Sequence, residues 1–325
     1  MDPSTIFGLS NKCTMKGNRL DDYVRIEPLG KGTYGSVYKG VNKRTNKQVA
    51  IKRLIIHQFV KDGVPLIASR EIAVLKKFHH PNIIQLEDFV LEEDILYIIL
   101  ELMDTNLQTY ITCLPEKECM PEPAIKRFLF QILQGVCYCH EKNLLHRDLT
   151  PENLLIKNDG TIKIADFSLS IENKYLLKDF YYRPRNKWYW APELLFGNCI
   201  YSLEVDVWSI GCIFAEMVIK SPLFMSYSMT DQAFRILSVL TSPYQDIIIG
   251  TENLPMFLKV IPGCEIDYLK ELVGKYISAD GIRVMRAMLA CNSRDRPTVK
   301  QILKNPYFSD VDRKKLPAGN YDGSS

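Results

Sequence analysis

The sequence predicts an α+β fold with two lobes, a smaller antiparallel-sheet lobe with one helix and a larger lobe that is mainly helical. Two observations predict it. The first third of the chain contains short runs rich in β-branched and aromatic residues, separated by turn segments with glycine or asparagine. Later segments instead place apolar residues at helical spacing. A chain of 325 residues is long enough to bury a substantial core.

Five strands are expected in the smaller lobe. They are Tyr23 to Leu29, Ser36 to Val41, Gln48 to Arg53, Ile83 to Val90 and Asp94 to Leu102. The first three follow one another across short turns, which favours consecutive antiparallel pairing. The pattern breaks at residues 104–106, so the lobes are expected at 23–103 and 104–309, with 1–22 and 310–325 as flexible flanks.

A helix is expected over Pro65 to Phe78, between the third and fourth strands. Ile67, Glu71 and Leu75 are four residues apart, so they share one face of this helix. An exposed glutamate would be the ordinary interpretation of Glu71. The apolar residues on the same stripe indicate instead that it points inward to a cationic partner, because an unpaired buried carboxylate is costly.

Two long helices are expected in the larger lobe. Pro123 to Glu141 has an apolar stripe at helical spacing. Glu204 to Ile219 is apolar nearly all round, which is typical of a helix buried inside a larger domain.

Charge and composition limit the function classes. Lys and Arg number 41 against 38 Asp and Glu, a formal charge of +3 without a block of like charges, so a nucleic-acid partner is not expected. The longest apolar run is far shorter than the ~18 residues of a membrane span, so no membrane association is expected. Nine scattered cysteines and a start without a secretory signal indicate an intracellular protein of the cytoplasm, the nucleus or both.

Three glycines, Gly30, Gly32 and Gly35, separate the first two predicted strands. Glycines let backbone amides approach phosphate oxygens without interference from side chains. The same spacing marks dinucleotide-binding folds, but there the glycines open a helix. Here Ser36 to Val41 continues as a strand, which favours a loop folded over a nucleotide.

Lys52 ends the run Val49-Ala50-Ile51-Lys52 on the third strand, and we expect it to contact nucleotide phosphates while paired with Glu71. A glycine loop, this strand and a helix glutamate occur in the same order in protein kinases, which the chain therefore resembles. Further along, His146-Arg-Asp-Leu-Thr-Pro-Glu-Asn153 resembles the kinase catalytic loop, and Asp166-Phe-Ser168 stands where kinases have Asp-Phe-Gly.

The resemblance implies a bilobal protein-kinase fold that uses ATP and Mg²⁺. In such a kinase Asp148 accepts the proton of the substrate hydroxyl, while Asn153 and Asp166 hold magnesium. Positioning and charge neutralisation are what phosphoryl transfer requires. Ala191-Pro192-Glu193, the segment from Asp206 to Gly211, and Arg296 resemble the family's fold-anchoring positions.

Within that family the chain is similar to the cyclin-dependent kinases of the CMGC group. Pro65 to Glu71 aligns with their PSTAIRE helix, and Asp206 to Met217 is nearly identical to the corresponding segment of the family. DQAFRIL at 231–237, followed by Thr241-Ser-Pro243, resembles the insert typical of this group. This implies a serine/threonine kinase in cell-cycle or transcriptional regulation, acting on protein substrates. A cyclin or other activating subunit is the candidate partner for the helix at 65–78.

The resemblance also assigns the adenine pocket. Leu100 guards its back, the backbone of Glu101 to Met103 bonds the base, and four apolar side chains sandwich the ring. Those four are Leu29, Val37, Ala50 and Leu155.

Three departures from the family concern the rate. Thr150 replaces the catalytic-loop lysine, Asn186 replaces that lysine's threonine partner, and Ser168 replaces the glycine of the metal loop. Our hypothesis is that a polar contact among Thr150, Asn186 and Asp148 compensates for the missing lysine. Catalysis is expected to be retained but slower, because the loss of one charge-stabilising donor typically raises the activation barrier by about 2.7 to 4 kcal/mol when nothing replaces it. Ser168 is expected to restrict the metal loop.

Other departures concern regulation. The activating threonine position falls on Tyr181, beside Tyr182, so we expect either tyrosine phosphorylation there or activity without phosphate. Arg70 and Arg147 keep two of the family's three phosphate-binding arginines, and the third position is Ile171.

The family's inhibitory phosphorylation sites correspond to Thr33 and Tyr34, where a phosphate would repel ATP. Two further replacements are Ser69, which removes an apolar anchor for a cyclin, and Trp190, which replaces an arginine tied to proline-directed specificity.

Two alternatives stay open. A pseudokinase would keep the fold, and serve as a scaffold or allosteric partner with weak or no phosphotransfer. A tyrosine-directed kinase is the other, although Pro151-Glu152-Asn153 follows the serine/threonine form of the loop.

Overall fold

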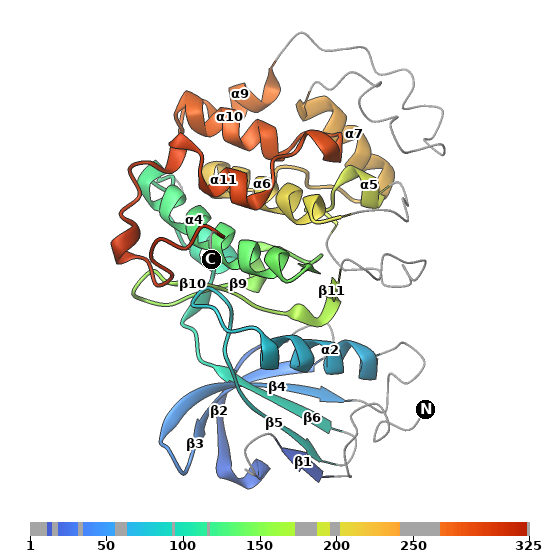
Figure 1. The fold of residues 1–325 in the computed structure, drawn as a ribbon. Coiled ribbons are helices and arrows are strands. Elements are labelled where there is room, and N and C mark those ends of the chain that lie inside the picture. Colours follow the sequence, from blue (N-terminus) through green and yellow to red (C-terminus); the bar gives the residue numbers. More distant parts are fainter. Residues whose placement is uncertain are drawn as a thin grey trace. The chain divides into compact units, whose positions relative to one another are not determined.

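The chain divides into two compact units, each described by itself below. The N-terminal unit is Met1–Asp104 with Ala165–Ser170, and the C-terminal unit is Thr105–Ile164 with Ile171–Ser325 (Figure 1). The computed structural model describes residues 12–14, 19–31, 35–55, 64–92, 95–115, 118–172, 187–195, 202–240 and 267–323. Among residues named above, Gly32, Thr33, Tyr34, Asp94, Tyr181, Tyr182, Asn186 and 241–243 lie outside the described residues.

An antiparallel sheet of six strands forms the N-terminal unit, in the order β1-β5-β6-β4-β3-β2. One face of the sheet buries apolar side chains that include Val49, Ile51 and Ile99. The antiparallel pairing predicted for the first three strands is confirmed. The strands are β1 Lys12–Thr14, β2 Tyr23–Lys31, β3 Gly35–Asn42, β4 Lys47–Ile55, β5 Leu86–Glu92 and β6 Ile95–Glu101.

Two expectations for this unit are wrong in detail. The predicted strand from Ile83 begins only at Leu86, because the amide of Ile83 bonds the carbonyl of His80 in a turn and Ile83 forms only an isolated bridge. The flank was expected to be flexible, yet β1 pairs with β5. A three-residue strand has too little pattern of its own to be predicted, since the edge of β5 decides its place.

Helix α2, Val64–Lys77, is the one helix expected in this unit. Ala68, Ile72 and Leu75 are buried, and Glu71 lies buried among them. The helix contacts β5 and the 3-10 turn η4, Phe167–Leu169. The inward orientation predicted for Glu71 is confirmed.

In its described residues the C-terminal unit has more helix than strand. The predicted helix at 204–219 is α6, whose Trp208 and Phe214 are fully buried, and α4 contacts it. In the described part of the chain no helix is long and apolar enough to cross a bilayer. The helices are α3 Leu107–Thr112, α4 Glu122–Glu141, α5 Pro192–Leu195, α6 Glu204–Ile219, α7 Met229–Leu240, α9 Tyr268–Val273, α10 Ala279–Met288 and α11 Val299–Leu303.

The described part of the C-terminal unit also contains short strands, which pair in two small sheets. One sheet has the order β10-β9-β7, and β11 pairs with β8. The strands are β7 Thr105–Asn106, β8 Leu144–Leu145, β9 Leu154–Ile156, β10 Ile162–Ile164 and β11 Ile171–Glu172, and the 3-10 turns are η3 Pro151–Asn153, η7 Ser293–Asp295, η8 Pro306–Phe308 and η9 Arg313–Lys315.

The C-terminal segment was expected to be a flexible flank, and for residues 310–323 this is wrong. The amide of Gln134 in α4 donates to the carbonyls of Gly319 and Tyr321 at 3.0 and 2.8 Å. Tyr321 also packs edge-on against Tyr138, and its hydroxyl donates to Glu141 at 2.5 Å. The tail thus supplies both acceptors for the buried amide nitrogen of Gln134.

Arg296 joins three segments of the C-terminal unit. Its guanidinium, 0% exposed, makes a bidentate pair with Glu193 at 2.7 and 2.8 Å. It also donates to the carbonyls of Ala290, Glu204 and Cys291, and lies over the Trp208 ring. The guanidinium nitrogens of Arg296 thus all donate hydrogen bonds, and these bonds offset the cost of burying its charge.

A second buried polar contact joins Tyr189 to α6. The Tyr189 hydroxyl donates to the Glu216 carboxylate at 2.6 Å, while Ser209 Oγ donates to the Tyr189 carbonyl at 2.8 Å. Burial raises the pKa of Glu216 from 4.5 to about 7, although the Tyr189 hydrogen bond opposes the shift. The polar groups thus fix the residues just before Ala191-Pro192-Glu193 onto the buried helix.

Arg296→Met is expected to destabilise the chain by roughly 3 to 5 kcal/mol, because Glu193 would lose its buried partner. Urea unfolding measures the change. Adding Glu193→Gln to Arg296→Met should recover part of the loss, since the unpaired charge is then gone. A single variant within about 1 kcal/mol of the natural protein would contradict this account.

Glu216→Gln is expected to change the pH dependence of stability. The folded-state pKa of Glu216 is raised, so its neutral form contributes stability below pH 4.5 that is lost as pH rises through about 7. Relative to the natural protein, the variant should therefore gain roughly 3 kcal/mol between pH 4.5 and pH 8. Thermal unfolding at several pH values measures it, with the exposed Glu27→Gln as control; parallel profiles for natural protein and Glu216→Gln would refute the assignment.

Candidate active site

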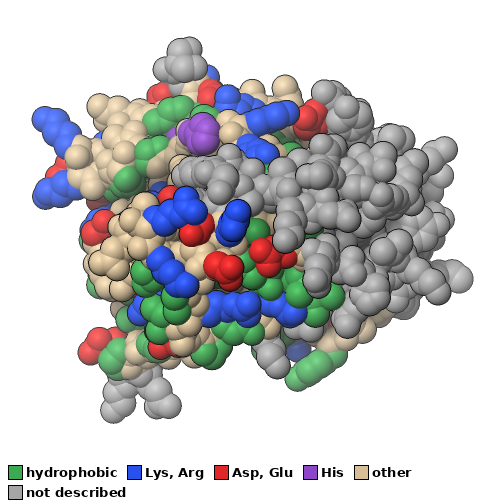
Figure 2. Space-filling view, turned by 90° about the horizontal axis from the view of Figure 1, so that it is seen from below, with side chains coloured by type: hydrophobic (Ala, Val, Ile, Leu, Met, Phe, Trp, Pro, Cys, Tyr) green, Lys and Arg blue, Asp and Glu red, His purple; other side chains and the backbone are tan. Residues whose placement is uncertain are grey.

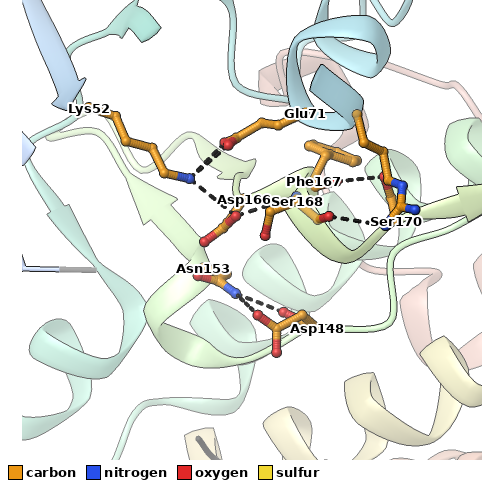
Figure 3. Close-up of polar contacts among 9 residues, drawn as sticks. Lys52, Glu71, Asp148, Asn153, Asp166, Phe167, Ser168 and Ser170 are labelled. Carbon is orange, nitrogen blue, oxygen red and sulfur yellow. Dashed lines mark hydrogen bonds and ion pairs between the residues drawn. The ribbon is translucent and has the colours of Figure 1, made fainter. Parts of the chain in front are cut away.

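A buried lysine lies between two carboxylates in the N-terminal unit (Figure 3). Lys52 Nζ in β4 is 2.8 Å from Glu71 Oε2 in α2 and 3.2 Å from Asp166 Oδ1. Glu71 is 2% exposed, so its charge depends on this partner. The pairing of Lys52 with Glu71 predicted from the sequence is thereby confirmed, and Asp166 joins it.

Charge balance keeps Lys52 protonated. Burial alone would lower the pKa of its ammonium group, but Asp166 and Glu71 together raise the pKa above its ordinary value. Burial raises the pKa of Glu71, and Lys52 opposes that shift. A fixed cation with a partly exposed carboxylate beside it suits the recognition of phosphates and their counterion.

The pairing of β3, β4 and β6 places a strip of apolar side chains next to Lys52. Val37 lies opposite Lys52, and Ala50 opposite Leu100. Because cross-strand partners share a face and side chains alternate, Val37, Ala50, Lys52 and Leu100 lie on one face of the sheet. An apolar strip ending in a cation matches a flat base followed by phosphates.

The remaining predicted contact residues are described here by their own elements and burial. Leu29, in β2, is about half exposed. Glu101 ends β6, and its amide bonds the carbonyl of Gln85 while its side chain accepts from the amide of that residue. Met103 is buried two residues later. Leu155, half-buried, belongs to β9 in the C-terminal unit.

The two described glycines of the loop differ in what requires them. A Cβ at Gly30 would meet no described atom within 4 Å, so packing in the described structure does not require glycine there. At Gly35 a Cβ would lie 1.8 Å from the carbonyl oxygen of Arg53 in β4. Close strand packing therefore excludes a side chain at Gly35, whatever the loop binds.

Asp166 occupies a strained backbone position. Its φ is +61°, in the left-handed region that L residues rarely adopt, and η4 follows directly. The amide of Ser168 donates to Asp166 Oδ1 at 3.4 Å, and Phe167 is fully buried. Ser168 has no positive φ, so this turn accommodates serine where kinases have glycine.

Asp206 of α6 anchors the loop that begins at His146 in the C-terminal unit. Its buried carboxylate accepts the backbone amides of His146 and Arg147 at 2.9 Å each, and lies 2.9 Å from His140 Nε2. Burial alone would raise the pKa of Asp206, but these hydrogen bonds and charges hold the pKa below its ordinary value. Arg147 adopts φ +66°, a conformation that such anchoring can stabilise.

Asp148 and Asn153 are brought together at the end of that loop (Figure 3). The Asn153 side-chain amide donates to the Asp148 carbonyl at 2.8 Å and to its Oδ2 at 3.0 Å. Because the amide is planar, aiming its nitrogen at Asp148 turns its oxygen to the other side. The contact orients the carboxylate proposed to receive a proton.

The donor types fit a hard divalent cation. Asp166 offers carboxylate oxygen and Asn153 an amide oxygen, the ligands that Mg²⁺ takes beside phosphates and water. Each is fixed by hydrogen bonds that engage the neighbouring atoms, namely Lys52 and Ser168 at Asp166, and Asp148 at Asn153. Each residue thus offers an oxygen donor of the type that binds such an ion.

Several departures can also be placed. Thr150 is buried, and its carbonyl accepts the amide of Asn153 at 3.0 Å. The proposed contact of Thr150 with Asn186 stays a prediction. Arg70 donates from Nη1 to the carbonyl of Ser168 at 3.4 Å. Trp190 is buried, with the Lys187 ammonium 5.9 Å from its ring centre.

Sequence reasoning missed one buried polar residue beside this site. Ser170 donates from Oγ to the carbonyl of Phe167 at 2.7 Å. An isolated serine after Leu169 carries no periodic or motif signal, so only the folded turn reveals it.

Surface charge is mixed. On the face drawn in Figure 2, Lys and Arg side chains are interspersed with Asp and Glu. Among the described surface pairs, Lys47 lies 2.6 Å from Glu87 and Arg44 lies 2.8 Å from Asp22. Neighbouring charges of opposite sign weaken any single-sign field at such a surface.

One comparison with known families bears on this arrangement. The model of the protein kinase domain family matches residues 23–308, which is most of the chain. The match spans the strand with Lys52, the helix with Glu71, the loop with Asp148 and the turn with Asp166. The chain therefore belongs to the protein kinase domain family, whose members use ATP, typically with a divalent metal, to phosphorylate proteins.

Proposed function

We propose that the chain is an active protein-serine/threonine kinase of the cyclin-dependent type that uses ATP with Mg²⁺. The observation that supports it best is Lys52, fixed between Glu71 and Asp166. Such a fixed cation is what a phosphoryl donor needs for positioning and charge neutralisation. The serine/threonine form of the loop at Pro151-Glu152-Asn153 supports the acceptor class.

In this mechanism each residue has one role. Lys52 holds phosphate oxygens, and Asp166 and Asn153 would hold magnesium, which supplies positive charge at the phosphates when bound. Asp148 orients the acceptor hydroxyl and takes its proton. The hydroxyl oxygen bonds the γ-phosphorus as the bond from that phosphorus to the β,γ-bridging oxygen breaks, and ADP leaves.

The proposal includes the activating partner only in a limited role. In the chain by itself Glu71 already reaches Lys52, and α2 already contacts η4. A cyclin-like subunit on the helix at 65–78 would therefore stabilise a pair that is formed without it. Ser69, in place of an apolar anchor, favours the same interpretation.

A pseudokinase scaffold is the second candidate function. Thr150 leaves the catalytic loop without the lysine that kinases place there, and one missing donor can cost about 2.7 to 4 kcal/mol of barrier. The retained pairs Lys52–Glu71 and Asn153–Asp148 favour the enzyme, because a scaffold has no need to orient Asp148.

Asp148→Asn tests the activity. Transfer of radiolabelled γ-phosphate to a mixed protein substrate should fall by about 10² to 10⁴-fold, because the proton acceptor is removed. Acid hydrolysis of the natural protein's product should give phosphoserine and phosphothreonine. Nucleotide binding is measured for both proteins as a control for folding. Equal, negligible transfer by two proteins that both bind nucleotide would instead support the scaffold.

Glu71→Gln tests the ion pair. We expect kcat/KM for ATP to fall about tenfold or more, since each ~1.4 kcal/mol lost from the positioning of Lys52 is a factor of ten. Glu87→Gln is the matched control, because Glu87 pairs with Lys47 at 2.6 Å on the surface of the same unit. Similar kinetics for the two variants would show that the buried pair does not serve the reaction.

A further inference from the structure

A buried hydroxyl that the proposed mechanism does not use closes the turn after Asp166. Ser170 is 0% exposed. Its Oγ donates to the carbonyl of Phe167 at 2.7 Å, and its amide donates to the same oxygen at 3.1 Å (Figure 3). The turn η4 is thus closed by two hydrogen bonds from one residue to one carbonyl.

Ser168 favours the same turn in a different way. It lies in the middle of η4, 3% exposed, without a positive φ. Any rearrangement that needed a left-handed residue at this position would be disfavoured for serine, whereas glycine would accept it. The carbonyl of Ser168 also accepts from Arg70 of α2 at 3.4 Å, which ties the turn to the helix that carries Glu71.

Asp166 depends on this turn. Its left-handed backbone is unfavourable by itself, and its carboxylate meets Lys52 and the amide of Ser168 only while η4 keeps its shape. Loss of the Ser170 hydroxyl would leave a buried carbonyl with one donor fewer. The strained residue and the hydroxyl are therefore linked through three residues of chain.

We propose that Ser170 is a positioning residue for Asp166. Its hydroxyl holds η4 closed, so that the Asp166 carboxylate faces Lys52 before nucleotide binds. This rests on the proposed function, in which Asp166 is a magnesium ligand. The Ser170 hydroxyl bonds the Phe167 carbonyl, so it acts on Asp166 through the turn.

Hydrogen exchange of the full chain without nucleotide tests the turn itself. Ser170→Ala should raise the exchange rate of the amides at 168 and 170 up to about fivefold, the factor expected for one ordinary hydrogen bond. Ser170→Thr, which keeps the hydroxyl, should restore the natural rate. Ser238→Ala is the matched control, because Ser238 Oγ donates to the Phe234 carbonyl at 2.9 Å in the C-terminal unit. Unchanged exchange at 168 and 170 in Ser170→Ala would overturn the proposal.

Binding of a fluorescent ATP analogue, with and without Mg²⁺, tests the positioning. In Ser170→Ala the Mg²⁺ concentration for half-maximal binding should rise up to about fivefold, while metal-free binding stays unchanged. Equal weakening of both would mean general damage to the pocket and would overturn the assignment. Absence of phosphate transfer by the natural protein would refute the proposed function alone, because the exchange contrast between the alanine and threonine variants does not depend on transfer.

Discussion

The ammonium group of Lys52 is the charge on which the rest of the N-terminal unit depends. A cation that is removed from water needs anionic partners, and two segments supply them, the helix with Glu71 and the turn with Asp166. Helix α2 can supply its carboxylate because Ala68 and Leu75, which share the face of Glu71, are buried. The helix therefore cannot pack without also placing its carboxylate near the lysine. The pairing of β4 with β3 and β6 fixes the face of the sheet on which Lys52 lies.

Patterns that are local and strong predicted much of this structure. A carboxylate on an apolar helix stripe was enough to predict that Glu71 faces inward, because the cost of burying an unpaired charge leaves few alternatives. Residues 204–219 are apolar nearly all round and form the buried helix α6. Among the site residues, the pairing of Lys52 with Glu71 followed from that reasoning, whereas the roles of Asp148, Asn153 and Asp166 came from resemblance to kinases.

Features decided by distant neighbours escaped prediction. Strand β1 exists because β5 offers an edge, and its three residues show no period of their own. Ile83 and Ile84 are as apolar as a strand requires, but a turn after His80 takes their first amide. Ser170 acquires its importance from a carbonyl three residues earlier, and only in a turn whose preceding residue is left-handed. Such contacts depend on tertiary geometry, which periodicity does not encode.

Because residues 310–323 pack on α4, the folded structure extends beyond the residue at which the family match ends. The family match ends at residue 308, yet the Gln134 amide finds its acceptors at Gly319 and Tyr321. A chain shortened to the match would leave that amide and the Tyr138 ring without the groups that cover them here. Deletion mapping that starts from the family boundary would thus remove part of the folded body, and a loss of solubility could then be mistaken for a loss of catalysis.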